Sequence, residues 1–359
     1  MKHVLTAALA GAALAAGLQL PIRAQAPPRT PELDALKGLT FRSLGPTNQA
    51  GRVSVIVGVP GKPSDFYVAG ANGGVFKTTN GGTTWKALFD DQNVLSIGAI
   101  ELAPSNPDIV YVGTGEGNPR NNASFGDGMY RSSDGGLTWT HIGLEDSDRI
   151  ARIRVDNRNP DVVYACALGK EWGPHEQRGV FKSTDGGTSW KKVLYRDDST
   201  GCSDIDVNPA NSNEVYAGMY TFRRQPFHLR SGGGETALYK SIDGGATWKK
   251  LTNGIPAMLD RIGVAVSRSE PETVYMISET PNYAGELWRS DDAGASWRVV
   301  NKDPQLSFRP FYYADIRVDP HDANRIYALG GSLWMSDDGG RNFQRIANDV
   351  HGDHQALWI

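Results

Sequence analysis

The chain has 359 residues, of which 39% are hydrophobic, 21% are charged and 42 are glycine, and its formal net charge is −3. This composition predicts a turn-rich globular protein with a real core. The near-neutral charge and the lack of a basic run argue against a nucleic acid as the main partner.

The first 26 residues predict a secretory signal peptide. Met1-Lys2-His3 precedes an apolar run over 4–20, and Ala24-Gln25-Ala26 offers a cleavage site. No later run is long enough to span a membrane as a helix. We therefore expect a mature protein that is soluble and is either secreted or periplasmic.

Residues 27–48 are predicted to form a lead-in that is Pro-rich at 27–31 and contains an isolated strand over 39–44. This strand is positioned to help close a ring of repeats. Residues 49–359 are predicted to form that ring.

One segment recurs through residues 49–359, with the form Ser-x-Asp-x-Gly-x-Thr/Ser-Trp, and 183–190 is a clear copy. An Asp followed by glycines predicts a tight turn whose carboxylate accepts hydrogen bonds from the following backbone N–H groups. We predict that these residues form turns and are neither catalysts nor metal ligands. The six turn positions, spaced by 46 to 58 residues, are Asn80, Asp134, Asp185, Asp243, Asp292 and Asp338.

Each repeat also predicts four short strands, A to D. In the second repeat these are 96–102, 109–113, 129–132 and 138–142, with the Asp turn between C and D. Four antiparallel strands repeated at this period predict an all-β protein, a β-propeller of four-stranded blades.

The end of the chain departs from this pattern. Six blades are complete, and 355–359 then has the character of the first strand of a seventh. An isolated inner strand would leave unpaired edges. The sequence therefore predicts an incomplete propeller, truncated at its C-terminus, whose intact form has at least seven blades.

The only cysteines, Cys166 and Cys202, lie in neighbouring repeats. We expect two buried free thiols. A disulfide between them is the alternative that an oxidising compartment permits.

The order of strands predicts where a ligand binds. In an up-and-down blade the A–B linkers and Asp turns share one face, and the B–C and D–A connections share the other. The B–C connections of blades two to four are long, and such loops carry function more often than the scaffold does. We predict a ligand-binding surface there, made of Glu116, Arg120, Trp172, His175, Arg223, Arg224, Tyr312, Tyr313, His351, Asp353 and His354.

We predict no cofactor and no metal site. The segment from His351 to His354 has three potential ligands, but no second cluster with ligand spacing accompanies it.

With its six Asp turns, its Asn-Pro linkers before Val-Tyr pairs, and the segments 168–174 and 351–354, the chain resembles the secreted bacterial Asp-box (BNR-repeat) propellers. These are related to the sortilin N-terminal domain and are often labelled glycosyl-hydrolase-like. The resemblance implies a module that binds a peptide, a protein or a glycan. It implies nothing about the oligomeric state.

The alternative is a glycoside hydrolase, since the resemblance extends to sialidases and xyloglucan-specific endoglucanases. Glycoside hydrolysis generally needs two carboxyl groups across the scissile bond. In the endoglucanases that the chain resembles, one catalytic Asp lies just before a Gly-Gly pair in the first blade. The matching stretch here is Ala71-Asn72-Gly73-Gly74, with Ala71 in the position of that Asp. A sialidase motif, Phe/Tyr-Arg-Ile-Pro, is matched only in part by 41–44. We therefore predict no catalytic residue and favour the binding module.

Overall fold

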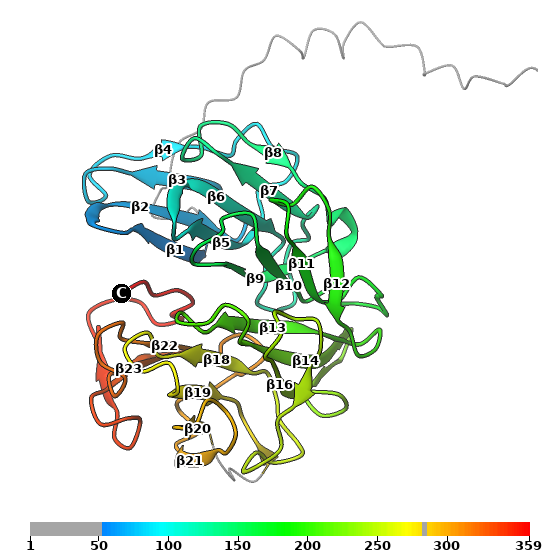
Figure 1. Cartoon of the computed structure of the whole chain (residues 1–359), viewed down its shortest axis with the longest axis vertical. Helices are drawn as coiled ribbons and strands as arrows, with labels where there is room; N and C mark the ends of the chain where they lie inside the picture. The colour runs from blue at the N-terminus through cyan, green and yellow to red at the C-terminus, as the bar shows by residue number, and fades with distance from the viewer. Residues whose placement is uncertain (1–51, 282–285) are drawn as a thin grey trace, which may run out of the picture. The chain divides into compact units, whose positions relative to one another are not determined.

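The computed structural model describes residues 52–281 and 286–359, and the predictions for 1–48 lie outside these ranges. The described residues form six antiparallel blades arranged as a propeller (Figure 1). Helix is sparse in this part of the chain, where one short 3-10 turn, η1, spans Glu145–Ser147. No helix among the described residues is long and apolar enough to cross a membrane.

The blades follow one another in chain order. Blade one contains β1 (Val53–Val59), β2 (Lys62–Gly70), β3 (Gly74–Thr78) and β4 (Lys86–Ala87). Blade two contains β5 (Ile97–Ala103), β6 (Asn106–Thr114), β7 (Met129–Ser132) and β8 (Thr140–His141). Blade three contains β9 (Ile150–Val155), β10 (Val163–Ala167), β11 (Gly179–Ser183) and β12 (Lys191–Leu194).

Blade four contains β13 (Thr200–Val207), β14 (Val215–Gln225), β16 (Ala237–Ser241) and β17 (Lys249–Lys250), and a fifth strand, β15 (His228–Ser231), extends β14 as a hairpin. Blade five contains β18 (Gly263–Val266), β19 (Val274–Ile277), β20 (Leu287–Ser290) and β21 (Arg298–Asn301). Blade six contains β22 (Asp315–Val318), β23 (Ile326–Leu329), β24 (Leu333–Ser336) and β25 (Gln344–Ile346). The four-stranded blades predicted from the repeats are confirmed.

The core lies between blades. The second strands β10 and β19 are buried along their whole length, because a neighbouring blade covers each face. Five apolar clusters occupy the five contacts between successive blades from one to six. The described residues contain no such cluster between blade six and blade one, and the inner strands touch in series from β1 to β22 without closing.

Tyrosines of the second strands tie the blades together. The Tyr67 hydroxyl donates to the Gly135 carbonyl at 2.9 Å, which belongs to the Asp turn of the next blade. Tyr164 makes the equivalent bond to Gly244 at 2.9 Å. These bonds explain why a tyrosine recurs at this position of the repeat.

The Asp turns hold their own carboxylates. In the turn of blade three the Ser189 N–H donates to Asp185 Oδ1 at 2.9 Å, and the Ser189 hydroxyl donates to Oδ2 at 2.6 Å. The Gly187 N–H donates to Ser183 Oγ at 2.8 Å. The hydrogen bonds from Ser189 are the main cause that lowers the pKa of Asp185 to about 2. This geometry is the one that the sequence predicts.

The predicted sharing of faces is also observed. The Gly186 N–H of an Asp turn donates to Asp161 O in the A–B linker of the same blade at 2.9 Å. On the opposite face, the His175 N–H of a B–C connection donates to Asp198 O of a D–A connection at 2.8 Å. We call these two sides the linker face and the loop face.

Two expectations were wrong. Cys166 and Cys202 form a disulfide that joins β10 to β13, because adjacent blades bring their Cα atoms to 5.0 Å. Residues 355–359 form no strand, since a strand needs a hydrogen-bonded neighbour. They run between blade six and blade one (Figure 1), where Trp358 packs so closely on Gly58 that a Cβ there would lie 2.5 Å from the indole ring.

Candidate functional site: the loop face

The centre of the loop face is a cluster of polar and aromatic side chains. Arg120 Nη1 donates to the Tyr312 hydroxyl at 3.0 Å, and the guanidinium lies 5.3 Å from the centre of the Tyr312 ring. Gln355 Nε2 also donates to this hydroxyl, and Asn118 Nδ2 donates to Gln355 Oε1 at 3.4 Å. The structure therefore joins the predicted residues Arg120 and Tyr312 to two amides, of Asn118 and Gln355.

Tyr313 and Asp353 lie beside this cluster. The Tyr313 hydroxyl donates to the Asp353 carboxylate, and burial together with that carboxylate raises the pKa of Tyr313. Beneath them is a cavity of about 30 Å³, which has room for ordered water and none for a sugar ring. A large ligand must therefore lie across the surface and not within it.

Two predicted residues are buried and hold loops in place. The Glu116 carboxylate is fully buried and accepts two bonds from Arg52, one of them at 3.0 Å from Nε. His175 Nδ1 faces the Lys170 N–H at 3.3 Å, and burial lowers the His175 pKa. Neither side chain is available to a ligand.

The predicted arginines of blade four are paired. Arg223 Nη2 donates to Ser199 Oγ at 2.9 Å. Arg224 Nε lies 3.6 Å from the buried Glu171 carboxylate, which Arg149 also approaches at 3.7 Å. Burial raises the pKa of Glu171, and the two arginines oppose that shift. The face therefore offers less free positive charge than the sequence suggested.

The histidines near the end of the chain do not form a metal site. His351 is exposed, and the His354 N–H donates to Gly330 O at 2.8 Å. Among residues 52–281 and 286–359, no group of three His, Cys, Asp or Glu side chains is arranged to hold a metal ion.

Exposed aromatic residues occur in several connections of this face. The described residues include six exposed aromatic side chains, and five of them lie in B–C or D–A connections. Trp172 was predicted to contribute to the site, whereas Phe125, Tyr195 and Phe308 were missed. The signal was present, since each is an aromatic residue within a polar connection. The five are Phe125, Trp172, Tyr195, Phe227 and Phe308.

Ala71 stands where the resemblance to endoglucanases requires a catalytic Asp. It is almost completely buried, and its N–H donates to Arg52 O at 2.9 Å. The position therefore has neither a carboxyl group nor access to solvent.

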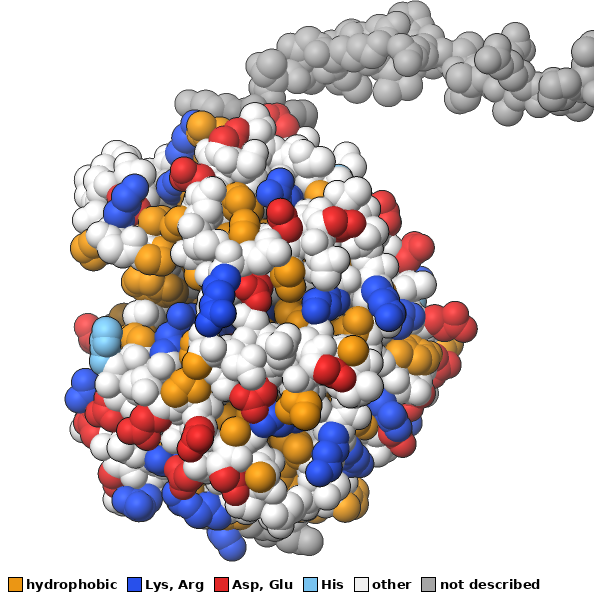
Figure 2. Space-filling view, viewed as in Figure 1, with side chains coloured by type: hydrophobic (Ala, Val, Ile, Leu, Met, Phe, Trp, Pro, Cys, Tyr) orange, Lys and Arg blue, Asp and Glu red, His pale blue; other side chains and the backbone are white. Residues whose placement is uncertain are grey.

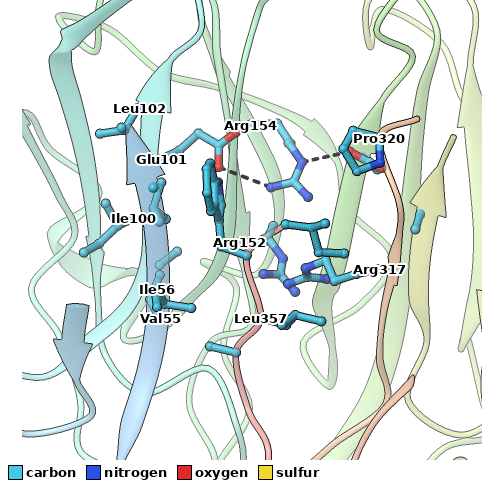
Figure 3. A pocket seen from close by; sticks show the side chains of 18 of the residues that line it. Val55, Ile56, Ile100, Glu101, Leu102, Arg152, Arg154, Arg317, Pro320 and Leu357 are labelled. Carbon is cyan, nitrogen blue, oxygen red and sulfur yellow. Dashed lines mark hydrogen bonds and ion pairs between the residues drawn. The ribbon is translucent and has the colours of Figure 1, made fainter. Parts of the chain in front are cut away.

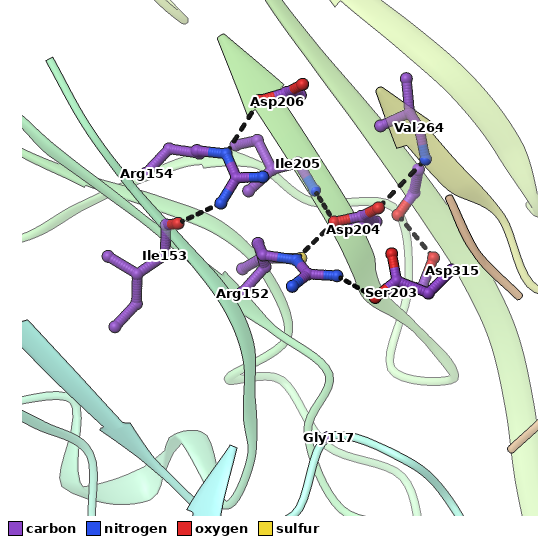
Figure 4. A network of polar contacts seen from close by, with 12 residues as sticks. Gly117, Arg152, Ile153, Arg154, Ser203, Asp204, Ile205, Asp206, Val264 and Asp315 are labelled. Atoms are coloured by element: carbon purple, nitrogen blue, oxygen red, sulfur yellow. Dashed lines mark hydrogen bonds and ion pairs between the residues drawn. The ribbon is translucent and has the colours of Figure 1, made fainter. Parts of the chain in front are cut away.

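A lattice of charged side chains crosses the central channel of the propeller, which the inner strands surround, beneath the loop face (Figure 4). Arg152 Nε donates to Asp204 Oδ1 at 2.8 Å, and Arg152 Nη2 reaches across the channel to Asp315 at 3.1 Å. Arg154 Nε donates to Asp206 Oδ1 at 2.8 Å. This lattice was not predicted from the sequence, although its charges alternate along β9 and β13 with the period of a strand.

Residues 127–285 match the family model described as "Sortilin, neurotensin receptor 3". A xyloglucanase from a Paenibacillus species is 27% identical over 273 residues, which are 74% of this chain and 23% of that protein. A probable oligoxyloglucan-reducing end-specific xyloglucanase from Neosartorya fischeri is 23% identical over 306 residues, 82% of this chain and 29% of that protein. The chain thus spans less than a third of these relatives.

Two solved structures show the same fold. The GH74 enzyme of Niastella koreensis superposes with a TM-score of 0.60 at 18% identity, covering 80% of this chain and 45% of that one. YCF48 bound to D1 peptide superposes with a TM-score of 0.53 at 16% identity, covering 83% of each chain. The xyloglucanase relatives favour the glycoside-hydrolase alternative over the binding-module interpretation.

Proposed function

We propose that this sortilin-related β-propeller is a propeller of the xyloglucanase type, which binds a xyloglucan-like polysaccharide across its loop face. The observation that carries the proposal is that five exposed aromatic residues lie in connections of one face. The named relatives supply the substrate class.

The chemistry of the face suits a neutral polysaccharide. Exposed rings offer flat apolar surface for stacking on sugar rings. The Asn118 and Gln355 amides and the Arg120 guanidinium offer donors and acceptors for hydroxyl groups. The predicted arginines of blade four are already close to carboxylates, since Arg224 lies 3.6 Å from Glu171 and Arg223 lies 3.8 Å from Asp198.

We assign binding, and no catalytic residue, to the described part of the chain. Hydrolysis through two carboxyl groups needs side chains that reach the glycosidic bond. Glu116, Glu171 and Asp353 on this face are instead held by Arg52, by two arginines and by Tyr313 respectively. Hydrolysis by the whole protein remains part of the proposal on the strength of its relatives.

We also infer an extracytoplasmic location. The signal-peptide pattern of 1–26 supports it, as does the Cys166–Cys202 disulfide, since such bonds persist in oxidising compartments.

Affinity gel electrophoresis of the full chain tests the proposal. Xyloglucan in the gel should retard the protein, whereas polygalacturonate should not, and a reducing-sugar assay on the same samples measures hydrolysis. The variant Trp172→Ala should weaken retardation by about fivefold to tenfold, the loss expected for one stacked ring.

Leu137→Ala is the matched control, because Leu137 is an equally exposed apolar residue on the linker face. Absence of retardation, or equal losses for the two variants, would contradict polysaccharide binding at the loop face. Capture of a peptide with no retardation by xyloglucan would favour the peptide-binding module instead.

A further inference from the structure

The channel has a second, larger cavity at its other end. It measures about 320 Å³, at the small end of the range for small-molecule sites, and is lined by the last residues of the inner strands. Pro60, Pro104, Pro209 and Pro320 of the A–B linkers form part of its rim, which places the opening on the linker face. Figure 2 shows hydrophobic side chains gathered in the notch between blades one and six. We call the cavity the vestibule.

The walls of the vestibule differ in character (Figure 3). Blades one and two contribute an apolar wall that includes Val55, Ile56, Ile100 and Leu102, and Leu357 of the C-terminal segment lies between the walls. Blades three, five and six contribute a cationic wall. Its arginines are Arg152, Arg154, Arg268 and Arg317.

The two carboxylates that line the vestibule, Asp206 of blade four and Glu101 of blade two, both accept hydrogen bonds from Arg154. Asp206 Oδ1 accepts from Arg154 Nε at 2.8 Å, and Oδ2 accepts from the Val266 N–H at 2.8 Å. Glu101 accepts from Arg154 Nη1 at 3.4 Å. Four arginines and two carboxylates line the cavity, and two of those arginines, Arg152 and Arg317, are bonded to carboxylates outside the lining. The carboxylates that balance them, Asp204 and Asp315, line the small cavity at the opposite end.

Some N–H donors of the vestibule arginines have no hydrogen-bond acceptor among the described residues. A guanidinium has five N–H groups. Within residues 52–281 and 286–359, Arg152 Nη1 and Arg154 Nη2 have no hydrogen-bond acceptor, and the exposed Arg268 has neither a hydrogen bond nor an ion pair. These donors flank a cavity whose other wall is apolar.

We propose that the vestibule binds a small monocarboxylate with an apolar tail, such as a medium-chain fatty acid. The carboxylate accepts bonds from Arg154 and Arg268, because charge-assisted bonds of this kind are strong and often bidentate. The tail lies on the wall formed by β1 and β5. The site is separate from the loop face, since the layer of Arg152, Asp204 and Asp315 lies between the two cavities.

Calorimetric titration of the full chain with octanoate tests the proposal, with 1-octanol and acetate as probes that lack the charge or the tail. Octanoate should bind at a single site, and both control probes should bind more weakly. Arg268→Gln should weaken octanoate binding by about tenfold, the loss of one bond to a charged group. Because Arg268 is exposed, this variant should fold normally.

Arg158→Gln is the matched control, since Arg158 is an exposed linker-face arginine outside the vestibule. Leu357→Ala should weaken octanoate and leave acetate unchanged. Three results would overturn the proposal: no octanoate binding, equal binding of octanoate and 1-octanol, or equal effects of the two arginine variants. Displacement of octanoate by xyloglucan would also overturn it, because the ligand would then lie on the loop face.

Discussion

The linker face and the loop face are built by the same six blades but differ in what the repeat imposes on them. On the linker face, the first glycine or alanine of each turn donates to the adjoining A–B linker or to the start of the second strand, as Gly339 does to Asn324 O at 2.9 Å and Gly135 to Asp108 O at 2.8 Å. On the loop face, a bond from the end of the second strand to the residue before the first strand recurs in blades one to four, as from the Leu168 N–H to Arg149 O at 2.9 Å. Beyond that bond the connections range from the tight turn at 71–73 to the β14–β15 hairpin.

This difference shows where the fold leaves freedom. A connection that must satisfy the same backbone groups in each blade cannot change much in length or composition. A B–C connection is held in this way only at its base, so the residues beyond that bond can include aromatic rings and paired charges. The loop face therefore carries the proposed polysaccharide site, whereas the linker face offers a site only where the channel opens.

The largest expected effect concerns the charged layer that separates the two ends of the channel. Asp204→Ala removes the partner of Arg152 and the acceptor of the Val264 N–H, which lies 3.0 Å from Asp204 Oδ2. Removing one member of an ion pair in the interior should lower the free energy of unfolding by about 3 to 5 kcal/mol. The loss arises because Arg152 and the Val264 N–H each lose a hydrogen-bond acceptor. Urea denaturation followed by tryptophan fluorescence measures this loss.

Asp291→Ala is the control for that experiment. Asp291 pairs with Arg289 and Arg298 at the surface, where ion pairs contribute about 1 kcal/mol or less. Similar losses for the two variants would show that the channel layer is no more stabilising than a surface pair.

The next effect concerns the Cys166–Cys202 disulfide, which joins blades three and four. Replacing both cysteines with alanine should lower the free energy of unfolding by about 2 to 4 kcal/mol, mainly by freeing the unfolded chain. Reducing agent should reproduce the loss in the native protein and have no effect on the variant. Octanoate binding should survive in both, since neither cysteine lines the vestibule.

The fold could be predicted from the sequence because each blade repeats the same local signals. The recurring residues make contacts within a blade or with its neighbour. They are Asp185 and its glycines, the tyrosine of the second strand and the tryptophan that follows the turn. The site was predicted less completely, because pairing across blades is not visible in one repeat. Glu116 and Arg224 look available in the sequence, yet their partners, Arg52 and Glu171, come from other parts of the loop face.

The smallest expected effect tests the repeat itself. Asp185→Asn keeps an acceptor for the Ser189 N–H and removes the charge, and blade one already uses this arrangement, with the Thr84 N–H donating to Asn80 Oδ1 at 2.9 Å. The variant should therefore fold, bind xyloglucan normally and lose only a small part of its stability at pH 7.

Folding lowers the pKa of Asp185 to about 2, from about 3.9 in the unfolded chain. The ionised carboxylate thus contributes its full stabilisation above about pH 4, and that stabilisation disappears as the pH falls through about 2. Chemical denaturation of both proteins at several pH values should show a difference that is constant near neutrality and shrinks between about pH 4 and pH 2. A difference that is independent of pH would show that the charge of Asp185 contributes nothing to the turn, and a loss of xyloglucan binding would show that the two faces are coupled.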